Sequence, residues 1–198
     1  MHAAERDTER VRAARGAFVE AMQGEDVTRF HFVDETSTNL TYCWRYGRAP
    51  GGARVGQGVP LHAGPNVTLI AALTPHGFGA AMTVSRAVNG DVFAAYLEQV
   101  LGPTLRPGDV VVLDNLPAHK LERLAPLVAA RGARLLYLPP YSPDFNLIEL
   151  AFSKLKTKLR QLQTRTQQAL EEALQAAAEW ISDLDARNWF AHCGYHVH

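Results

Sequence analysis

The sequence predicts one α/β domain, built on a mixed β-sheet with helices packed on its faces. Short apolar segments that suit strands come first, and helical segments alternate with strands in the second half of the chain. Early hairpins followed by helix–strand alternation are typical of a mixed sheet, because parallel strands need crossover connections. The length of 198 residues is that of one domain with at most an appendage.

The first half of the chain is expected to hold one helix and then strands. Residues 8–22 place apolar side chains at helical spacing. Strands are expected at residues 30–33, 42–46, 67–73 and 80–84, the last two joined as a hairpin through the turn at 74–79. Residues 48–58 carry one proline and four glycines, which indicates a loop.

The second half is expected to alternate helices and strands. Asn89 is a suitable N-cap for a helix that stops at Gly102 and Pro103. Residues 110–113 are all apolar, as in a strand buried on both faces, and they end at Asp114. The remaining elements are expected as a helix at 121–130, a strand at 135–138, and helices at 147–162 and 167–181.

Composition favours a globular protein in a reducing compartment. The chain is 47% hydrophobic and 20% charged with a formal net charge of zero, so a nucleic-acid site would need local clustering of charge. Cys43 and Cys193 form no CxxC pair, which argues against a disulfide framework. No signal peptide is visible, and the longest apolar run, at residues 67–73, is too short to span a membrane. We therefore expect a cytoplasmic protein with no membrane partner.

Three acidic residues are candidates for a metal site. Asp34 and Asp114 each follow an expected strand, and Glu149 opens a helix after a proline-rich segment. Each has a structural alternative, because aspartates often end strands or form turns, and Glu149 can complete a capping box with Asn146. Together they supply the oxygen ligands that Mg²⁺ prefers, from different elements, as a two-metal site for phosphoryl transfer requires.

Positive charge is concentrated after Glu149. Five basic residues and no acidic ones lie between Glu149 and Glu171: Lys154, Lys156, Lys158, Arg160 and Arg165. A solvated helix face is the simpler explanation, and a surface for a phosphate backbone is the functional one. A second basic patch, on and beside the glycine-rich loop, comprises Arg45, Arg48 and Arg54.

Three segments of the sequence resemble the catalytic blocks of DDE transposases. They are FVDE at residues 32–35, VVLDNLPAHK at 111–120 and LPPYSPDFNLIE at 138–149. The 34 residues between Asp114 and Glu149 match the spacing typical of the mariner-related branch of bacterial insertion sequences. With WRYGRAP at 44–50 and HCGY at 192–195, the resemblance covers nearly everything from Phe30 to Tyr195.

The resemblance implies a ribonuclease H-like fold, with a mixed five-stranded sheet and helices on both faces, in residues 29–198. Residues 1–28 would be an N-terminal helix and linker. It also implies two Mg²⁺ or Mn²⁺ ions on the catalytic Asp34, Asp114 and Glu149, which would cleave DNA phosphodiesters and transfer strands at insertion-sequence ends. Residues expected to line the site are Asn115, His119 and Asn146, and those expected to contact DNA are Arg45, Arg48, Lys154, Lys156, Lys158 and Arg160. Glu35 is left out, because alternation along a strand points it away from Asp34.

The sequence departs from the family pattern at two places. Leu147 stands where the family usually has proline, which predicts a looser start to the following helix. Family members also carry an N-terminal helix-turn-helix domain that recognises element ends, whereas we expect none in this chain. DNA recognition would then need a separate helix-turn-helix chain, and a homodimer on paired ends is a family expectation. Two alternatives stay open: an idle transposase remnant that binds DNA or a partner transposase, and a nuclease for RNA–DNA hybrids.

Overall fold

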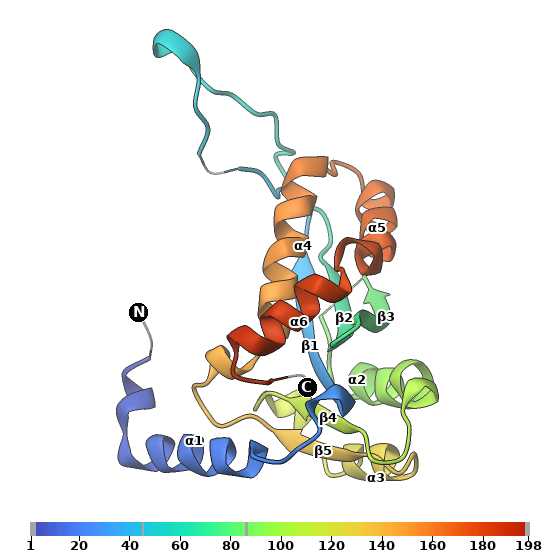
Figure 1. The fold of residues 1–198 in the computed structure, drawn as a ribbon. Helices are drawn as coiled ribbons and strands as arrows, with labels where there is room; N and C mark the ends of the chain where they lie inside the picture. The colour runs from blue at the N-terminus through green and yellow to red at the C-terminus, as the bar shows by residue number, and fades with distance from the viewer. Residues whose placement is uncertain (1–2, 45, 86, 197–198) are drawn as a thin grey trace.

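One mixed five-stranded sheet organises the computed structural model, which describes residues 3–44, 46–85 and 87–196 (Figure 1). The strand order is β3-β2-β1-β4-β5. The strands are β1 (Phe30–Thr38), β2 (Val67–Thr74), β3 (Gly77–Val84), β4 (Val110–Leu113) and β5 (Arg134–Tyr137). β1, β2 and β3 are antiparallel neighbours, whereas β4 and β5 run parallel to β1. The expected mixed sheet is confirmed.

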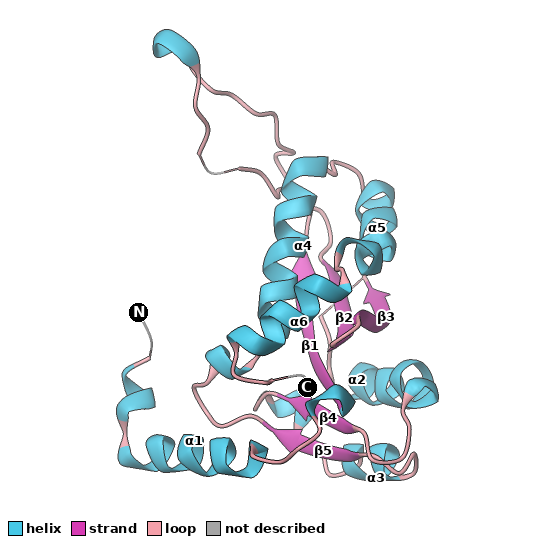
Figure 2. Ribbon diagram, viewed as in Figure 1, coloured by secondary structure: helices cyan, strands magenta, loops and turns pink. Residues whose placement is uncertain are grey.

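Helices cover both faces of the sheet (Figure 2). The helices beyond the N-terminal one are α2 (Gly90–Tyr96), α3 (Leu124–Ala129), α4 (Ile148–Leu162), α5 (Gln167–Gln175) and α6 (Asp183–His192). Phe30 and Phe32 of β1 pack in one core cluster with residues of α4, α5 and α6. Val33 points the other way and packs in a second cluster with residues of α2 and α3. This alternation makes β1 the strand that serves both cores.

Helix α4 lies along β1, so its first turn holds the end of the proline-rich segment, residues 138–147, close to the sheet (Figure 1). Its apolar stripe is buried at Ile148, Ala151, Leu155 and Leu159, as the helical spacing predicts. Leu162, which the same spacing placed on the buried face, is 47% exposed in the last turn. The helix ends at Leu162 and is capped by Gln163, whose φ of 51° is left-handed.

Several expected boundaries were wrong. The first strand continues from the predicted end at residue 33 to Thr38, because it pairs with β2 over seven residues. No strand forms among the described residues of 42–46, where the carbonyl of Tyr42 accepts a hydrogen bond from Arg165 and not from a neighbouring strand. The helix expected at 167–181 ends at Gln175 and continues as a 3-10 turn, and α6 was not predicted.

A long excursion, residues 39–66, joins β1 to β2 and projects beyond the end of α4 (cyan in Figure 1). Its tip, the 3-10 turn Pro50–Gly52, is exposed, and so is Tyr46, at 92%. Arg165, which follows α4, donates from Nη1 to the carbonyls of Leu40 and Tyr42 at 3.1 and 2.8 Å. The excursion is therefore fixed at its base, while most of its length makes little contact with the sheet.

The N-terminal helix α1 (Glu9–Met22) packs against the segment that precedes α4. Arg15 donates from Nη2 to Asp144 Oδ2 at 2.7 Å and from Nη1 to Ser142 Oγ at 2.6 Å. Phe18 stacks on Phe145 with ring centroids 5.3 Å apart. The helix expected in residues 8–22 is confirmed, and it supports the segment that leads to Glu149.

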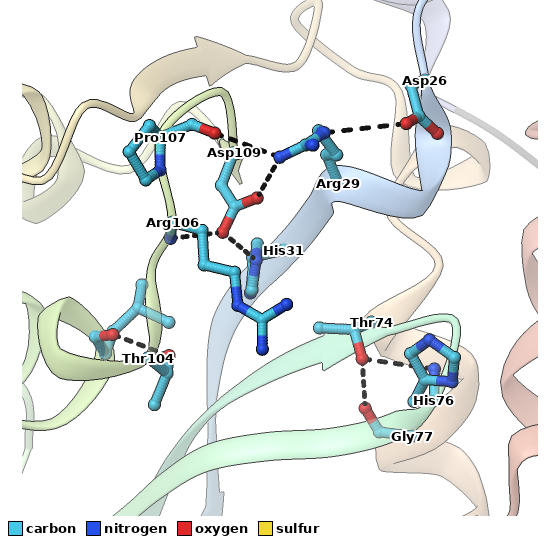
Figure 3. Close-up of polar contacts among 11 residues, drawn as sticks. Asp26, Arg29, His31, Thr74, His76, Gly77, Thr104, Arg106, Pro107 and Asp109 are labelled. Carbon is cyan, nitrogen blue, oxygen red and sulfur yellow. Dashed lines mark hydrogen bonds and ion pairs between the residues drawn. The ribbon is translucent and has the colours of Figure 1, made fainter.

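A buried polar cluster lies where β1 and β4 begin (Figure 3). Asp109, just before β4, accepts a hydrogen bond from the Arg106 backbone N–H at 2.7 Å. Its Oδ2 also lies 3.2 Å from His31 Nε2 on β1. Burial lowers the pKa of His31, although Asp109 opposes the change. Within the described residues, no helix is both long and apolar enough to cross a membrane.

Candidate metal and nucleic-acid site

Asp34 lies inside β1 and is buried, at 8% exposure. The parallel register pairs Phe32 with Val112, so two further residues bring Asp34 beside Asp114. The backbone N–H of Glu35 donates to Asp34 Oδ1, and the Asn146 amide donates to Oδ2, both at 2.8 Å. The prediction that Asp34 follows its strand was wrong, because β1 continues past it to Thr38, but the pairing of β1 with β4 still brings it beside Asp114.

Asp114 directly follows β4, as predicted. Its Oδ1 accepts a hydrogen bond from the Leu116 backbone N–H at 2.9 Å and lies 2.6 Å from His119 Nδ1. Both contacts converge on one oxygen of the carboxylate. In the part of the chain that the structure describes, Oδ2 has no hydrogen-bond partner. This arrangement leaves one Asp114 oxygen available to a ligand.

Glu149 stands in the first turn of α4 with an exposed side chain. The capping-box alternative is wrong, because the Asn146 side chain binds Asp34 and no side chain caps α4. The N-cap residue is Leu147, which is fully buried and has a φ of −64°. That φ is one that proline would also adopt. The carboxylate of Glu149 therefore has no capping role in this structure.

A cavity of about 470 Å³ brings most of the predicted site together. It is lined by Arg10, Asp114, Asn115, Leu116, Lys120, residues 138–143, Asn146 and Glu149. Asp34 contacts its wall through the hydrogen bond from Asn146. Asn115 also donates its amide to the Leu138 carbonyl, which ties the ends of β4 and β5. Two carboxylates and two predicted lining residues thus share one hollow.

His119 does not line the cavity as predicted, because its side chain is fully buried. Its ring lies between two carboxylates, with Nδ1 2.6 Å from Asp114 Oδ1 and Nε2 2.9 Å from Glu35 Oε2. Burial lowers the pKa of His119, but the bonds to Asp114 and Glu35 outweigh it and raise the pKa to about 9. Sequence reasoning missed Glu35. Its side chain points away from the face of the sheet that carries Asp34, as expected, but on the opposite face it contacts His119.

The three candidate carboxylates have unequal affinities for protons. Burial, together with the charge of Asp114, raises the pKa of Asp34 to about 7. Burial also acts on Asp114, but hydrogen bonds from His119 and Leu116 outweigh it and lower that pKa. Burial raises the pKa of Glu149, with Lys156 acting against it. The negative charges of Asp34 and Asp114 repel each other, and a bound divalent cation would remove that repulsion. The carboxylates therefore fit Mg²⁺ or Mn²⁺.

The carboxylates are not gathered into a closed ligand shell. Among the described residues, no three acidic, histidine or cysteine side chains already sit close enough together to hold a metal ion. Asp34 and Asp114 come from adjacent strands, whereas Glu149 comes from the first turn of α4 across the cavity.

The predicted DNA-contacting residues are divided among several surroundings. Lys154 is ion-paired with Asp185 at 2.6 Å, and it lines a smaller hollow together with Lys158 and Trp180. Arg160 lies over the Tyr42 ring at 5.3 Å, and Lys156 acts electrostatically on Glu149. Arg48 is exposed on the excursion, and Arg45 lies outside the described residues. Arg10 and Lys120, which line the cavity, were not predicted.

Solved structures of the Mos1 mariner transposase are similar to this chain. Its catalytic domain with raltegravir and magnesium matches at 13% identity and a TM-score of 0.72, covering 98% of this chain and 92% of that one. The pre-cleavage Mos1 transpososome matches at 14% identity and a TM-score of 0.73, and the paired-end complex with manganese at 16% and 0.73. This chain spans 60% of the transpososome chain and 61% of the paired-end one.

These likenesses define the fold as ribonuclease H-like, with the mixed five-stranded sheet and flanking helices that we expected. A family model described as DDE superfamily endonuclease matches residues 29–171. The chain therefore belongs to the DDE superfamily endonuclease family. No match was found among curated protein sequences.

Proposed function

We propose that this chain is the catalytic domain of a transposase from the mariner-related branch of bacterial insertion sequences. In this proposal Asp34, Asp114 and Glu149 hold two Mg²⁺ or Mn²⁺ ions. The reaction is cleavage of DNA phosphodiesters at element ends, followed by transfer of the freed 3′-hydroxyl to target DNA. The family match and the likeness to Mos1 support the class of reaction.

The pairing of Asp34 with Asp114 is the observation that carries the proposal. Two acids placed side by side, one in a strand and one just after the neighbouring parallel strand, cost folding energy unless a cation binds them. The raised pKa of Asp34, which burial and Asp114 cause, is the physical sign of that cost. Glu149 faces the same cavity as Asp114, so a third carboxylate stands within the site.

The chain's own residues have distinct tasks in this reaction. Bound divalent ions would activate the attacking oxygen and stabilise the leaving one. Asn146 holds Asp34 by one oxygen, and Asn115 fixes the loop after β4 to the end of β5. Arg10 and Lys120 supply positive charge at the cavity wall, where a scissile phosphate would lie.

DNA would extend from this cavity over basic residues outside it. Lys156, Lys158 and Arg160 on α4, with Arg48 on the excursion, are the available contacts. Lys154 contributes less in this state, because Asp185 already pairs with it. One Mos1 transposase structure is a paired-end complex with a left transposon end. For this chain we propose element-end and target DNA as partners, with a homodimer and a separate helix-turn-helix chain supplying recognition.

Mn²⁺ binding, followed by calorimetry, tests the proposal on the whole chain. We expect the wild type to bind Mn²⁺ and to bind it more tightly with a short DNA duplex present. Asp114→Asn should lose at least tenfold in affinity, because it removes one ligand charge from the site. Asp109→Asn is the matched control, since it makes the same change in a buried aspartate at the other end of β4.

The outcomes separate the proposed function from its alternatives. Equal Mn²⁺ binding by wild type and Asp114→Asn would overturn the metal site and leave an idle, DNA-binding remnant. Metal-dependent cleavage of RNA–DNA hybrid but not of duplex DNA would instead indicate a hybrid nuclease.

A further inference from the structure

We propose that Glu35 and His119 are positioning residues that hold Asp114 by one oxygen and keep its other oxygen directed at the metal. This inference rests on the proposed function, because it concerns how the same site is prepared. Neither residue lines the cavity that Asp114 and Glu149 share. Their side-chain contacts with the site run through Asp114, and the charge of Glu35 also acts on Asp34.

The contacts form a continuous chain through the sheet. Glu35 leaves β1 on the face opposite Asp34, and its Oε2 lies 2.9 Å from His119 Nε2. The other ring nitrogen lies 2.6 Å from Asp114 Oδ1. Because the two nitrogens stand on opposite sides of the imidazole, fixing one bond fixes the direction of the other. A carboxylate–imidazole–carboxylate chain therefore links the neighbouring strands β1 and β4.

The two aspartates of the site are anchored differently. Asp34 accepts a hydrogen bond on each of its oxygens, from Glu35 N–H and from Asn146. Asp114 receives both of its contacts on Oδ1, from Leu116 N–H and from the imidazole. Within the described residues, Oδ2 has no hydrogen-bond partner. An aspartate held on one side only is well suited to present its other oxygen to a cation, because its rotamer is set before the cation arrives.

The surroundings of the His119 ring suit a role in orienting Asp114 better than contact with a substrate. His119 is fully buried, and the Phe93 ring packs on it with centroids 4.2 Å apart. The Tyr137 hydroxyl donates to the His119 carbonyl at 2.7 Å, which fixes the backbone. With ring packing and backbone both restrained, the contact with Glu35 fixes the direction of the Nε2 edge of the imidazole.

Packing alone is the competing explanation, and two substitutions at Glu35 distinguish it. Glu35→Leu keeps a side chain of similar size beside the ring but removes the hydrogen bond to Nε2. Glu35→Gln keeps a partner for Nε2, since its amide can accept or donate. If the pair positions Asp114, Glu35→Leu should raise the Mn²⁺ concentration for half-maximal binding and cleavage by about 10–100-fold. Saturating Mn²⁺ should restore the cleavage rate of Glu35→Leu. For Glu35→Gln, the Mn²⁺ concentration for half-maximal binding should stay within about threefold of the wild-type value.

His31→Leu provides the matched control. It removes a histidine–carboxylate contact of the same kind, His31 with Asp109, at the opposite end of the same two strands (Figure 3). It should lower stability without changing the Mn²⁺ requirement. An equal change in His31→Leu and Glu35→Leu would overturn the positioning role, because the effect would then follow from stability alone.

A readout without metal keeps this inference separate from the proposed function. NMR of the metal-free protein can follow the His119 ring ¹⁵N and the Asp114 carboxylate ¹³C signals. We expect Glu35→Leu to shift both and Glu35→Gln to shift them much less. Unchanged signals in Glu35→Leu would overturn the positioning role, even if metal binds. If the signals shift in Glu35→Leu but the wild type binds no Mn²⁺, the positioning contact is supported and the proposed function is overturned.

Discussion

Asp34 is a buried acid whose charge disfavours the folded state in the absence of a cation. Its pKa is raised to about 7 by burial and by Asp114, from an ordinary value of 3.8. Between these values the folded state binds more protons than the unfolded state, so stability falls as pH rises from about 4 to about 7. Each pKa unit corresponds to about 1.4 kcal/mol.

Asp34→Asn should therefore stabilise the metal-free protein. At pH 8 we expect the free energy of unfolding in urea to rise by about 1–3 kcal/mol, after allowing for one poorer hydrogen bond in the amide. The variant should also lose the fall in stability between pH 4 and 7. Mg²⁺ should stabilise the wild type and not the variant. A variant less stable than wild type at pH 8 would mean that the charge of Asp34 is already compensated.

At the scale of residues, the sequence offers the three acids as candidates and misses the contacts of His119 with Asp114 and Glu35. Asp34, Asp114 and Glu149 are candidates on residue type, on the Asp114-to-Glu149 spacing and on the resemblance of three segments, although Asp34 lies inside its strand and not after it. His119 looks like a surface histidine, because it follows Pro117 in a short turn. Its burial depends on Phe93, which is distant in sequence, and on Glu35 across the sheet. Such contacts between elements leave no periodic signal in the chain.

At the scale of elements, α1 acts as a support for the segment that carries Asn146 to Asp34. Arg15→Leu should lower the free energy of unfolding by about 1–3 kcal/mol. It removes charge-assisted bonds to Asp144 and Ser142 and the cation–π contact with Phe145. We also expect faster amide hydrogen exchange in residues 144–149, because the segment loses its clamp.

Arg12→Leu is the control for this prediction. Arg12 lies on the same helix, but its side chain is 70% exposed and its contact with Asp7 is 3.8 Å long. Exposed pairs of this kind contribute about 0–1 kcal/mol. Similar hydrogen exchange in both variants would contradict the view that α1 clamps the segment before α4.

The element boundaries that sequence analysis missed have two physical causes. The apolar run of β1 stops at Asp34, yet the strand continues because its backbone pairs with β2 and its polar side chains find partners, as Thr38 does with the Val67 carbonyl. Helix α6 has only a weak apolar stripe. Its start was nevertheless readable, since Ser182 and Asp185 form a capping box. The pairing of β1 with β2 joins residues far apart in the sequence, so no local pattern predicts it. The capping box of α6, in contrast, is a local pattern that predicts a helix start.

At the scale of the whole molecule, the fold separates a packed α/β body from a projecting excursion. Both hydrophobic clusters lie in the body, on the two faces of the sheet. The excursion carries several exposed apolar residues: Trp44, Tyr46, Val55, Val59 and Leu61. Composition alone predicts neither cluster nor excursion. The proline and glycines of residues 48–58 predict a loop, but only the pairing of β1 with β2 reveals how far it extends.

This separation predicts where a protease cuts first. Trypsin should cleave early at Arg48 and Arg54, because these residues are exposed on backbone outside any strand pairing, whereas Lys154 and Arg160 lie on the packed helix α4. The fragments should stay associated, since β1 and β2 remain hydrogen-bonded along seven residue pairs. Gel electrophoresis in denaturant would then show separate fragments, while size-exclusion chromatography and far-UV circular dichroism would show an intact fold. First cleavage within α4, or separation of the fragments in native buffer, would mean that the excursion contributes to the stability of the body.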